Sequence, residues 1–131
     1  MATIFSRIIS GELPCHKVAE NDQFLAFLDI QPLRMGHVLV IPKVETDYIF
    51  DMADEELAEM MVFAKKVAIG IKQVIPCRKI GVSVIGLEVP HAHIHLVPMD
   101  AMNDMNFSGT KMQPEHEALA ALANQLFAVI Q

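Results

Sequence analysis

Three histidines in strict alternation are the part of this sequence that most clearly points to chemistry. His91, His93 and His95 stand in the segment VPHAHIHLVP, and the residues between and after them are apolar. Side chains alternate between the two faces of a β-strand, so this spacing predicts three imidazoles on one face and Ala92, Ile94 and Leu96 on the other. Packing alone does not explain such a row, because burying imidazoles side by side costs desolvation.

Two kinds of chemistry fit this row. The first is metal binding, since zinc accepts histidine nitrogen. Residues two apart on a strand are about 6.6 Å from each other and can share an ion, whereas the outer two, about 13 Å apart, cannot. Other ligands, such as His37 or an acidic residue, would have to complete the site. The second is chemistry on phosphorus, where a neutral imidazole acts as nucleophile and its neighbours stabilise anionic oxygen or protonate a leaving group.

Length and composition limit what the chain can be. Its 131 residues suit a single domain spanning residues 1–131, and a hydrophobic fraction of 53% excludes intrinsic disorder. A net charge of −6 argues against a nucleic-acid partner held by a basic surface. The sequence shows no secretory signal or membrane span, and Cys15 and Cys77 have no metal-ligand spacing. A cytoplasmic protein with no membrane partner is expected.

The pattern of apolar residues, prolines and glycines predicts the elements that position the histidines. Thr3 caps a short helix, Asp51 caps a long amphipathic helix that reaches residue 75, and Pro114 begins a last helix after an irregular stretch that starts near residue 101. Connections of hairpin length favour an antiparallel sheet, and hence the α+β fold class. Its five strands are expected over residues 16–20, 24–30, 37–41, 79–85 and 89–97, the last of them stopped by Pro98.

Residues 91–97 resemble the histidine-triad (HIT) signature, His-x-His-x-His-x-x with apolar x. Three further segments resemble the same family in the same order: IFSRIISGELP from residue 4, FLAFLDIQP from residue 24 and GHVLVIPK from residue 36. The resemblance implies a homodimer in which two five-stranded sheets join, and hydrolysis or transfer at the α-phosphate of a nucleotide, usually a purine. The surplus of apolar residues fits such a dimer, whose interface the resemblance places along residues 51–75 and 79–85.

The resemblance also implies roles for individual residues. His93 would attack phosphorus and form a nucleotidyl-histidine intermediate, from which water releases the monophosphate. His91 would orient His93, and His95 would bind phosphate oxygens and help the leaving group. His37 stands where the family keeps a histidine near the triad, and Asp29 would accept hydrogen bonds from the ribose hydroxyls. The other implied nucleotide-binding residues are six in an apolar slot for the base and two just before the triad: Ile4, Phe5, Ile8, Phe27, Ile30, Leu39, Gly86 and Glu88.

The sequence departs from the family pattern in two places. Many relatives have Gly-Gln followed by Ser or Thr before the triad, whereas here Leu87 and Glu88 follow the glycine, so an amide and a hydroxyl are missing. Some bacterial relatives bind structural zinc through N-terminal cysteines and a histidine after the Pro-Lys pair. Ser6 and the pair Val44-Glu45 stand at the corresponding positions here, which predicts no zinc and no cofactor.

The leading hypothesis is a nucleotide phosphoramidase, hydrolase or nucleotidyl transferase acting on a purine nucleotide or nucleotide conjugate. Leu87 and Glu88 motivate the alternative, a nucleotide-binding regulatory protein with little turnover. A metal-dependent enzyme is a third possibility, which the metal content of the purified protein would test.

Overall fold

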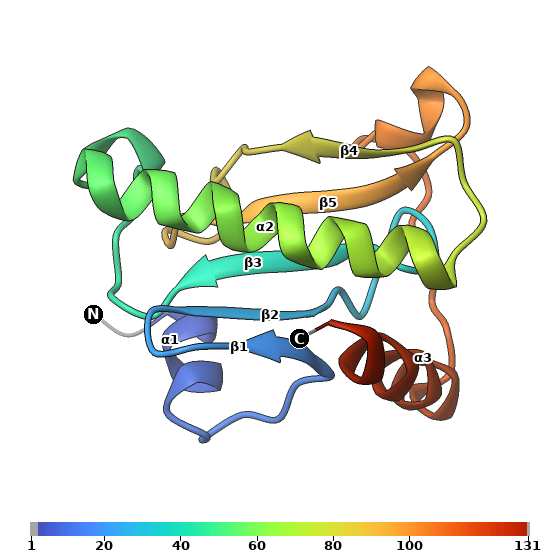
Figure 1. The fold of residues 1–131 in the computed structure, drawn as a ribbon, viewed down its shortest axis with the longest axis horizontal. Helices are drawn as coiled ribbons and strands as arrows, with labels where there is room; N and C mark the ends of the chain where they lie inside the picture. The colour runs from blue at the N-terminus through green and yellow to red at the C-terminus, as the bar shows by residue number, and fades with distance from the viewer. Residues whose placement is uncertain (1–2, 131) are drawn as a thin grey trace.

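Five strands form one antiparallel sheet in the order β1-β2-β3-β5-β4 (Figure 1). The structure is a computed structural model and describes residues 3–130. The predicted α+β class with a five-stranded antiparallel sheet is confirmed. The strands are β1 (Lys17–Glu20), β2 (Phe24–Leu28), β3 (Val38–Pro42), β4 (Lys79–Ser83) and β5 (Ile94–Met99). The helices are α1 (Ile4–Ile9), α2 (Asp54–Val74) and α3 (His116–Val129), with short 3-10 helices η1 (Ile49–Asp51) and η2 (Met102–Met105).

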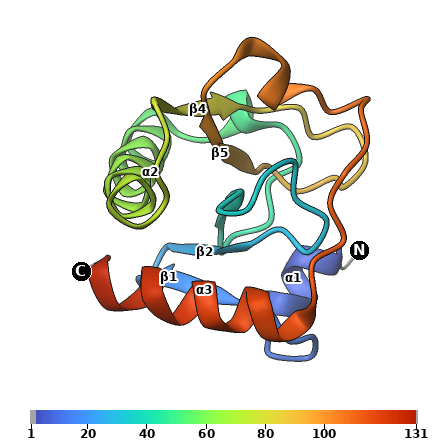
Figure 2. The same ribbon diagram turned by 90° about the vertical axis from the view of Figure 1, so that its right-hand side faces the viewer.

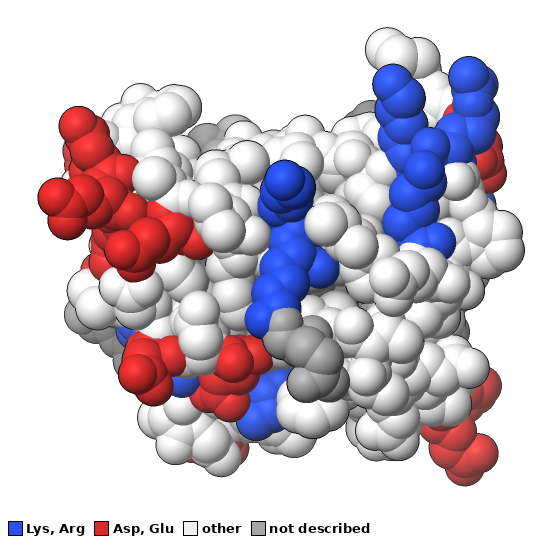
Figure 3. All heavy atoms as spheres, in the orientation of Figure 1, with Lys and Arg blue, Asp and Glu red and all other residues white. Residues whose placement is uncertain are grey.

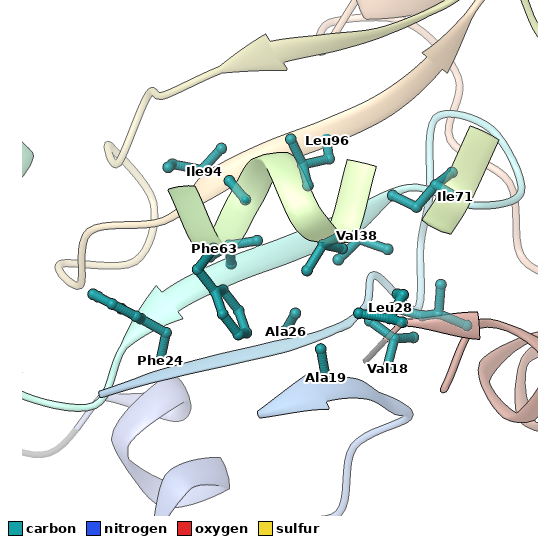
Figure 4. Close-up of a cluster of buried hydrophobic side chains, with 14 of the residues drawn as sticks. Val18, Ala19, Phe24, Ala26, Leu28, Val38, Phe63, Ile71, Ile94 and Leu96 are labelled. Atoms are coloured by element: carbon teal, nitrogen blue, oxygen red, sulfur yellow. The ribbon is translucent and has the colours of Figure 1, made fainter. Parts of the chain in front are cut away.

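The central strands β2 and β3 are buried on both faces of the sheet. Helix α2 lies on one side and α1 on the other, while α3 packs beside β1 and against α2 (Figure 2). Because β2 is apolar at every position, Phe24, Ala26 and Leu28 enter the core beneath α2, while Leu25 and Phe27 enter a smaller cluster beneath α1. Figure 4 shows side chains of the larger core converging between α2 and the sheet. The face beneath α1 is the one that carries the histidines.

Helix α2 starts later than the sequence predicts. Asp51 does not cap it, because the chain first forms the short helix η1, which buries Ile49, and the N-cap is Ala53. Acidic side chains gather over the start of α2 and basic ones over its far end and the start of β4, as the helix dipole favours (Figure 3). The helix ends at Val74, ahead of Pro76. Among residues 3–130, none of the helices combines the length and the hydrophobicity that a membrane span requires.

The strand that follows the histidines is displaced from its predicted position. Strand β5 begins at Ile94 and continues through Pro98 to Met99, so the prediction that Pro98 ends it is wrong. The pairing of β5 with β3 ends at Leu96, so Pro98 is paired with β4 alone and its missing N–H breaks no ladder bond to β3. The remaining strands agree with their predicted bounds to within two residues.

Candidate active site

The three histidines of the triad are buried side by side on the face beneath α1. His91, His93 and His95 are 0%, 7% and 8% exposed, and the rings of His93 and His95 lie 4.8 Å apart. The alternating residues Ala92, Ile94 and Leu96 lie in the core beneath α2. The predicted alternation is therefore confirmed, although the first two histidines stand just before β5 rather than within it.

Hydrogen bonding fixes the proton of the central histidine. Nδ1 of His93 lies 2.7 Å from the carbonyl oxygen of His91. A carbonyl can only accept, so Nδ1 carries the proton and Nε2 keeps its lone pair. Burial lowers the pKa of His93, which keeps the ring neutral at pH 7. Phe5 packs edge-on against this ring at 5.0 Å. His93 thus presents a neutral imidazole whose unprotonated nitrogen, Nε2, can act as a nucleophile.

His37 and His95 form a second ordered pair. The Leu33 N–H donates to Nδ1 of His37 at 3.1 Å, so His37 carries its proton on Nε2 and donates it to Nδ1 of His95 at 3.0 Å. His95 must then hold its own proton on Nε2. Burial lowers the pKa of His37 to about 4 and that of His95 to about 3, so both rings are neutral at pH 7. The pair offers an N–H donor on His95 but no positive charge.

His91 connects the triad to the N-terminal helix. Its Nε2–H donates to the carbonyl oxygen of Pro42 at 2.8 Å, so in the neutral ring Nδ1 accepts from the hydroxyl of Thr3 at 3.2 Å. Thr3 is also the N-cap of α1, because its Oγ1 accepts from the Ser6 N–H at 3.0 Å. The hydroxyl of Ser6 accepts in return from the Thr3 N–H at 2.8 Å. One hydrogen-bond network therefore joins the α1 cap, His91 and, through the His91 carbonyl, His93.

Asp29 lies beside His37 because the β2–β3 ladder continues one bond beyond the strands. The Asp29 N–H donates to the His37 carbonyl at 3.0 Å. The Asp29 carboxylate accepts from the Gln31 N–H at 2.9 Å, and its other oxygen is 3.7 Å from Nε2 of His37. Burial raises the pKa of the Asp29 carboxyl, and the hydrogen bond from Gln31 opposes that shift. The arrangement leaves a carboxylate at the pocket wall that can accept hydrogen bonds.

The histidines open into a pocket of about 440 Å³, a size typical of small-molecule sites. Nine of the predicted site residues line it: Ile4, Phe5, Asp29, His37, Leu39, Gly86, Glu88, His93 and His95. A larger hollow of about 640 Å³ lies between α2, α3 and the β1–β2 turn, but none of the histidines lines it. The smaller pocket is therefore the candidate active site.

Four predicted site residues do not line this pocket among the described residues. His91 is fully buried behind it, and Ile8 and Phe27 belong to the apolar cluster that supports its floor. Ile30 is 65% exposed, because β2 ends at Leu28 and the chain turns away from the sheet. The contact of Ile30 with a base therefore stays a prediction.

The pocket contains one group that could hold a metal ion. Among residues 3–130, ligand atoms of Asp29, His37 and His95 lie within 4.8 Å of one another. Zinc accepts these atom types, but binding would have to break the hydrogen bond between the two imidazoles. Cys15 and Cys77 are both free thiols and do not belong to this group. The absence of zinc stays a prediction of the sequence.

Sequence reasoning missed two pocket residues in the segment after β5. Phe107 contacts the ring of His95 with a centroid distance of 4.6 Å, and Lys111 also lines the pocket. The segment has no apolar periodicity, and its only sequence signal is an isolated phenylalanine in a polar stretch. Gln31, Ile85, Leu87 and Val89 also line the pocket.

The antiparallel sheet with its buried row of histidines has the architecture of the histidine-triad class of protein. The profile of the HIT domain matches residues 10–102, and this chain belongs to the HIT domain family.

Characterised relatives and solved structures agree with this assignment. Adenosine 5'-monophosphoramidase hnt1 of Schizosaccharomyces pombe is 39% identical over 100 residues, which cover 75% of this chain and 74% of that protein. Adenosine 5'-monophosphoramidase HNT1 of Saccharomyces cerevisiae is 33% identical over 132 residues, covering 99% of this chain and 84% of that protein. The crystal structure of a zinc-bound histidine triad family protein from Mycobacterium smegmatis superposes with a TM-score of 0.84. It is 26% identical and covers 99% of this chain and 94% of its own.

Proposed function

We propose that this chain is a nucleotide phosphoramidase or hydrolase, or a nucleotidyl transferase, that acts at the α-phosphate of a purine nucleotide. The observation that carries the proposal is the state of His93. Its proton is fixed on Nδ1 by the His91 carbonyl at 2.7 Å, and its ring lines the pocket with Nε2 unprotonated. Membership of the HIT family, with relatives named as adenosine 5'-monophosphoramidases, supports a phosphorus–nitrogen bond as the bond cleaved.

The proposed reaction has two displacements at phosphorus. In the first, Nε2 of His93 forms a bond to the α-phosphorus, the bond to the leaving amine breaks, and the amine takes a proton from solvent water. The positive charge that develops on the ring is stabilised by the His91 carbonyl next to Nδ1–H. In the second, water attacks phosphorus, the bond to His93 breaks, the monophosphate leaves and a proton returns to solvent. His95 donates its N–H to a phosphoryl oxygen throughout.

The walls of the pocket support a nucleoside as the bound group. Ile4, Phe5 and Leu39 provide apolar surface against which a base can stack, and Asp29 offers carboxylate oxygens for the ribose hydroxyls. Calorimetric titration with AMP and GMP measures the preference for the base. Weaker binding of AMP to Asp29→Asn would support the ribose contact.

The test of the mechanism is the release of AMP from adenosine 5′-phosphoramidate, adenylyl-lysine and a dinucleoside polyphosphate. We expect His93→Ala to lower the rate at least about 100-fold, because it removes the nucleophile. His116→Ala is the matched control, since His116 is an exposed histidine on α3 that does not line the pocket. Mass analysis of rapidly quenched protein should detect a nucleotidyl adduct on His93. A variant that releases AMP as fast as the parent would refute covalent catalysis by this residue.

A second candidate function is nucleotide binding with little turnover. It is favoured by the mouth of the pocket, where Leu87 is 89% exposed and Glu88 places a carboxylate near the site of an anionic substrate. Calorimetric binding of AMP or GMP to a parent protein that turns over none of the three substrates would establish this function instead.

We also propose a homodimer formed through β4. Within residues 3–130 this strand has a single neighbour, β5, so its other edge offers unpaired backbone groups to a second copy. Val82 on this strand is 52% exposed, and Met61 on α2 is 45% exposed. Light scattering at micromolar concentration should show a dimer, and Val82→Lys should shift it toward monomer. Val129→Lys, at an exposed valine on α3, serves as the control. A monomeric parent would refute this assembly.

A further inference from the structure

The segment from residue 100 to residue 114, here called the strap, runs from the end of β5 to α3 on the side of the sheet that carries α1 (Figure 2). Two sets of contacts hold it to the β2–β3 loop. Arg34 pairs with Asp104 at 3.0 Å and Asp100 at 3.2 Å, and the Met112 N–H donates to the Pro32 carbonyl at 2.9 Å. The strap is therefore anchored on both sides of the residues that enter the pocket. The HIT profile ends at residue 102, so most of the strap lies beyond it.

Phe107 packs the strap against the histidine pair. Its ring meets that of His95 edge-on at 4.6 Å and that of His37 at 6.1 Å. These two histidines are only 8% and 1% exposed. The strap thus forms one wall of the pocket directly beside the proposed site of the phosphate.

Without the strap, the residues that line the pocket would offer an anion no positive charge at pH 7. The lining histidines are neutral at pH 7, and Asp29 and Glu88 are carboxylates. Lys111 is the one lysine or arginine among the described lining residues. It is half-buried and takes part in none of the ion pairs of residues 3–130. A nucleotide phosphate entering this pocket would meet two negative charges and this single permanent positive one.

Lys111 shares the pocket with the histidine pair. Lys111, His37 and His95 all line it, and Phe107, which precedes Lys111 in the strap, contacts the ring of His95 at 4.6 Å. The charge of Lys111 adds to the lowering of the pKa of His37 and His95, for which burial is the largest cause. The ammonium group and the N–H of His95 are therefore offered to a ligand in the same pocket.

We propose that Lys111 is a substrate-binding residue whose ammonium group binds the phosphate of a nucleoside 5′-phosphate, which makes the strap part of the nucleotide site. The inference rests on the proposed function and deepens it, because it assigns recognition of the phosphate charge to a residue outside the family profile. His95 can supply a hydrogen bond but no charge, and Leu87 and Glu88 supply neither an amide nor a hydroxyl. A charge–charge contact in a partly buried pocket is stronger than the same contact in water.

The test compares a ligand that carries the phosphate with one that lacks it. Calorimetric titration with AMP and with adenosine is carried out on the parent, Lys111→Met, Lys111→Arg and Lys65→Met. Lys65 is an exposed lysine on α2, so Lys65→Met controls for the loss of one positive charge. We expect Lys111→Met to weaken AMP binding about 10- to 100-fold, the usual effect of losing a charged hydrogen-bond partner, with adenosine binding unchanged. Lys111→Arg should restore most of the AMP affinity.

The outcomes separate this inference from the proposed function. If Lys111→Met binds AMP as tightly as the parent, the phosphate role is refuted while the nucleotide site stands. If AMP and adenosine binding weaken by the same factor, Lys111 acts on the shape of the pocket and not on phosphate, which also overturns the inference. A parent that binds neither ligand would refute the proposed function and, with it, the role of Lys111. Thermal unfolding of each variant confirms that the measurements concern folded protein.

Discussion

Replacing Thr3 by valine should lower stability and kcat without weakening substrate binding, because Thr3 supports the histidine triad but does not line the pocket. Valine has nearly the same shape but no hydroxyl, so two groups lose their partner at once. The Ser6 N–H at the start of α1 loses the acceptor that lies 3.0 Å away, and Nδ1 of the fully buried His91 loses its donor at 3.2 Å. Thr3 does not line the pocket, so a nucleotide would not contact the substituted side chain.

The expected loss of stability follows from these two groups. Removing an N-cap costs about 1 kcal/mol. Leaving a buried acceptor without a partner costs about 1–3 kcal/mol. The free energy of unfolding should therefore fall by roughly 2–4 kcal/mol, and the Tm of a chain of this length by roughly 10 °C. Because His91 also orients His93 through its carbonyl, kcat should fall while KM stays close to that of the parent.

Urea and thermal unfolding measure the first effect, and AMP release from adenosine 5′-phosphoramidate measures the second. Thr3→Ser keeps the hydroxyl and should stay within about 0.5 kcal/mol of the parent. Ser6→Ala is the informative control, because it removes the reciprocal bond from the Thr3 N–H and leaves the bond to His91 intact. If Thr3→Val and Ser6→Ala lose the same stability and neither changes kcat, the hydrogen bond to His91 contributes nothing and the reasoning is wrong.

Three further predictions concern the buried pocket. In the folded protein the pKa values of His37 and His95 are about 4 and about 3, so both stay neutral well below pH 6.5. In the unfolded chain the same two histidines bind protons as the pH falls below about 6.5, which favours the unfolded state. Stability should therefore fall by roughly 2 kcal/mol or more between pH 7.5 and 5.5, measured by urea unfolding; a flat profile would contradict this. Phe107→Ala should expose His95 and raise its pKa, because burial is the main cause of the lowered value; an unchanged NMR titration would contradict it. Elemental analysis should find no stoichiometric zinc, whereas one equivalent per chain that is lost in His37→Ala would show a metal at the Asp29 group.

The parts of the site that could be predicted are those that depend on local pattern and on hairpin pairing. The period of two over residues 91–95 places the three histidines on one face of an extended chain. Asp29 and His37 were expected at the site from the resemblance to the HIT family, and in the structure the backbone bond of 3.0 Å between them continues the β2–β3 ladder. The succession of strands and helices along the chain, including the long helix, was predictable from the local pattern of apolar residues, prolines and glycines.

The parts that could not be predicted depend on neighbours that are distant in sequence. Pro98 is tolerated in β5 because the pairing with β3 stops at Leu96, which no local pattern around Pro98 reveals. Asp51 looks like a cap, but the chain forms η1 before α2 begins. Phe107 reaches the histidines because Arg34 anchors the strap from 66 and 70 residues away. An irregular segment offers no periodicity from which such a position could be derived.

The two supports of the histidine row come from opposite ends of the chain, and both lie outside the HIT profile of residues 10–102. Thr3 holds His91 at one end, and Phe107 packs against His95 at the other. The proton positions themselves are set inside the profile, by the carbonyls of His91 and Pro42 and the N–H of Leu33. The hydrogen bonds that fix the proton of His93 therefore lie within the profile, and we expect the flanking segments to add rigidity to the histidine row and, through Lys111, a positive charge at the phosphate. It follows that Thr3→Val should act mainly on kcat and Lys111→Met mainly on affinity. If each substitution changed kcat and affinity by the same factor, support of the triad and binding of the phosphate could not be assigned to separate segments, and this reasoning would be wrong.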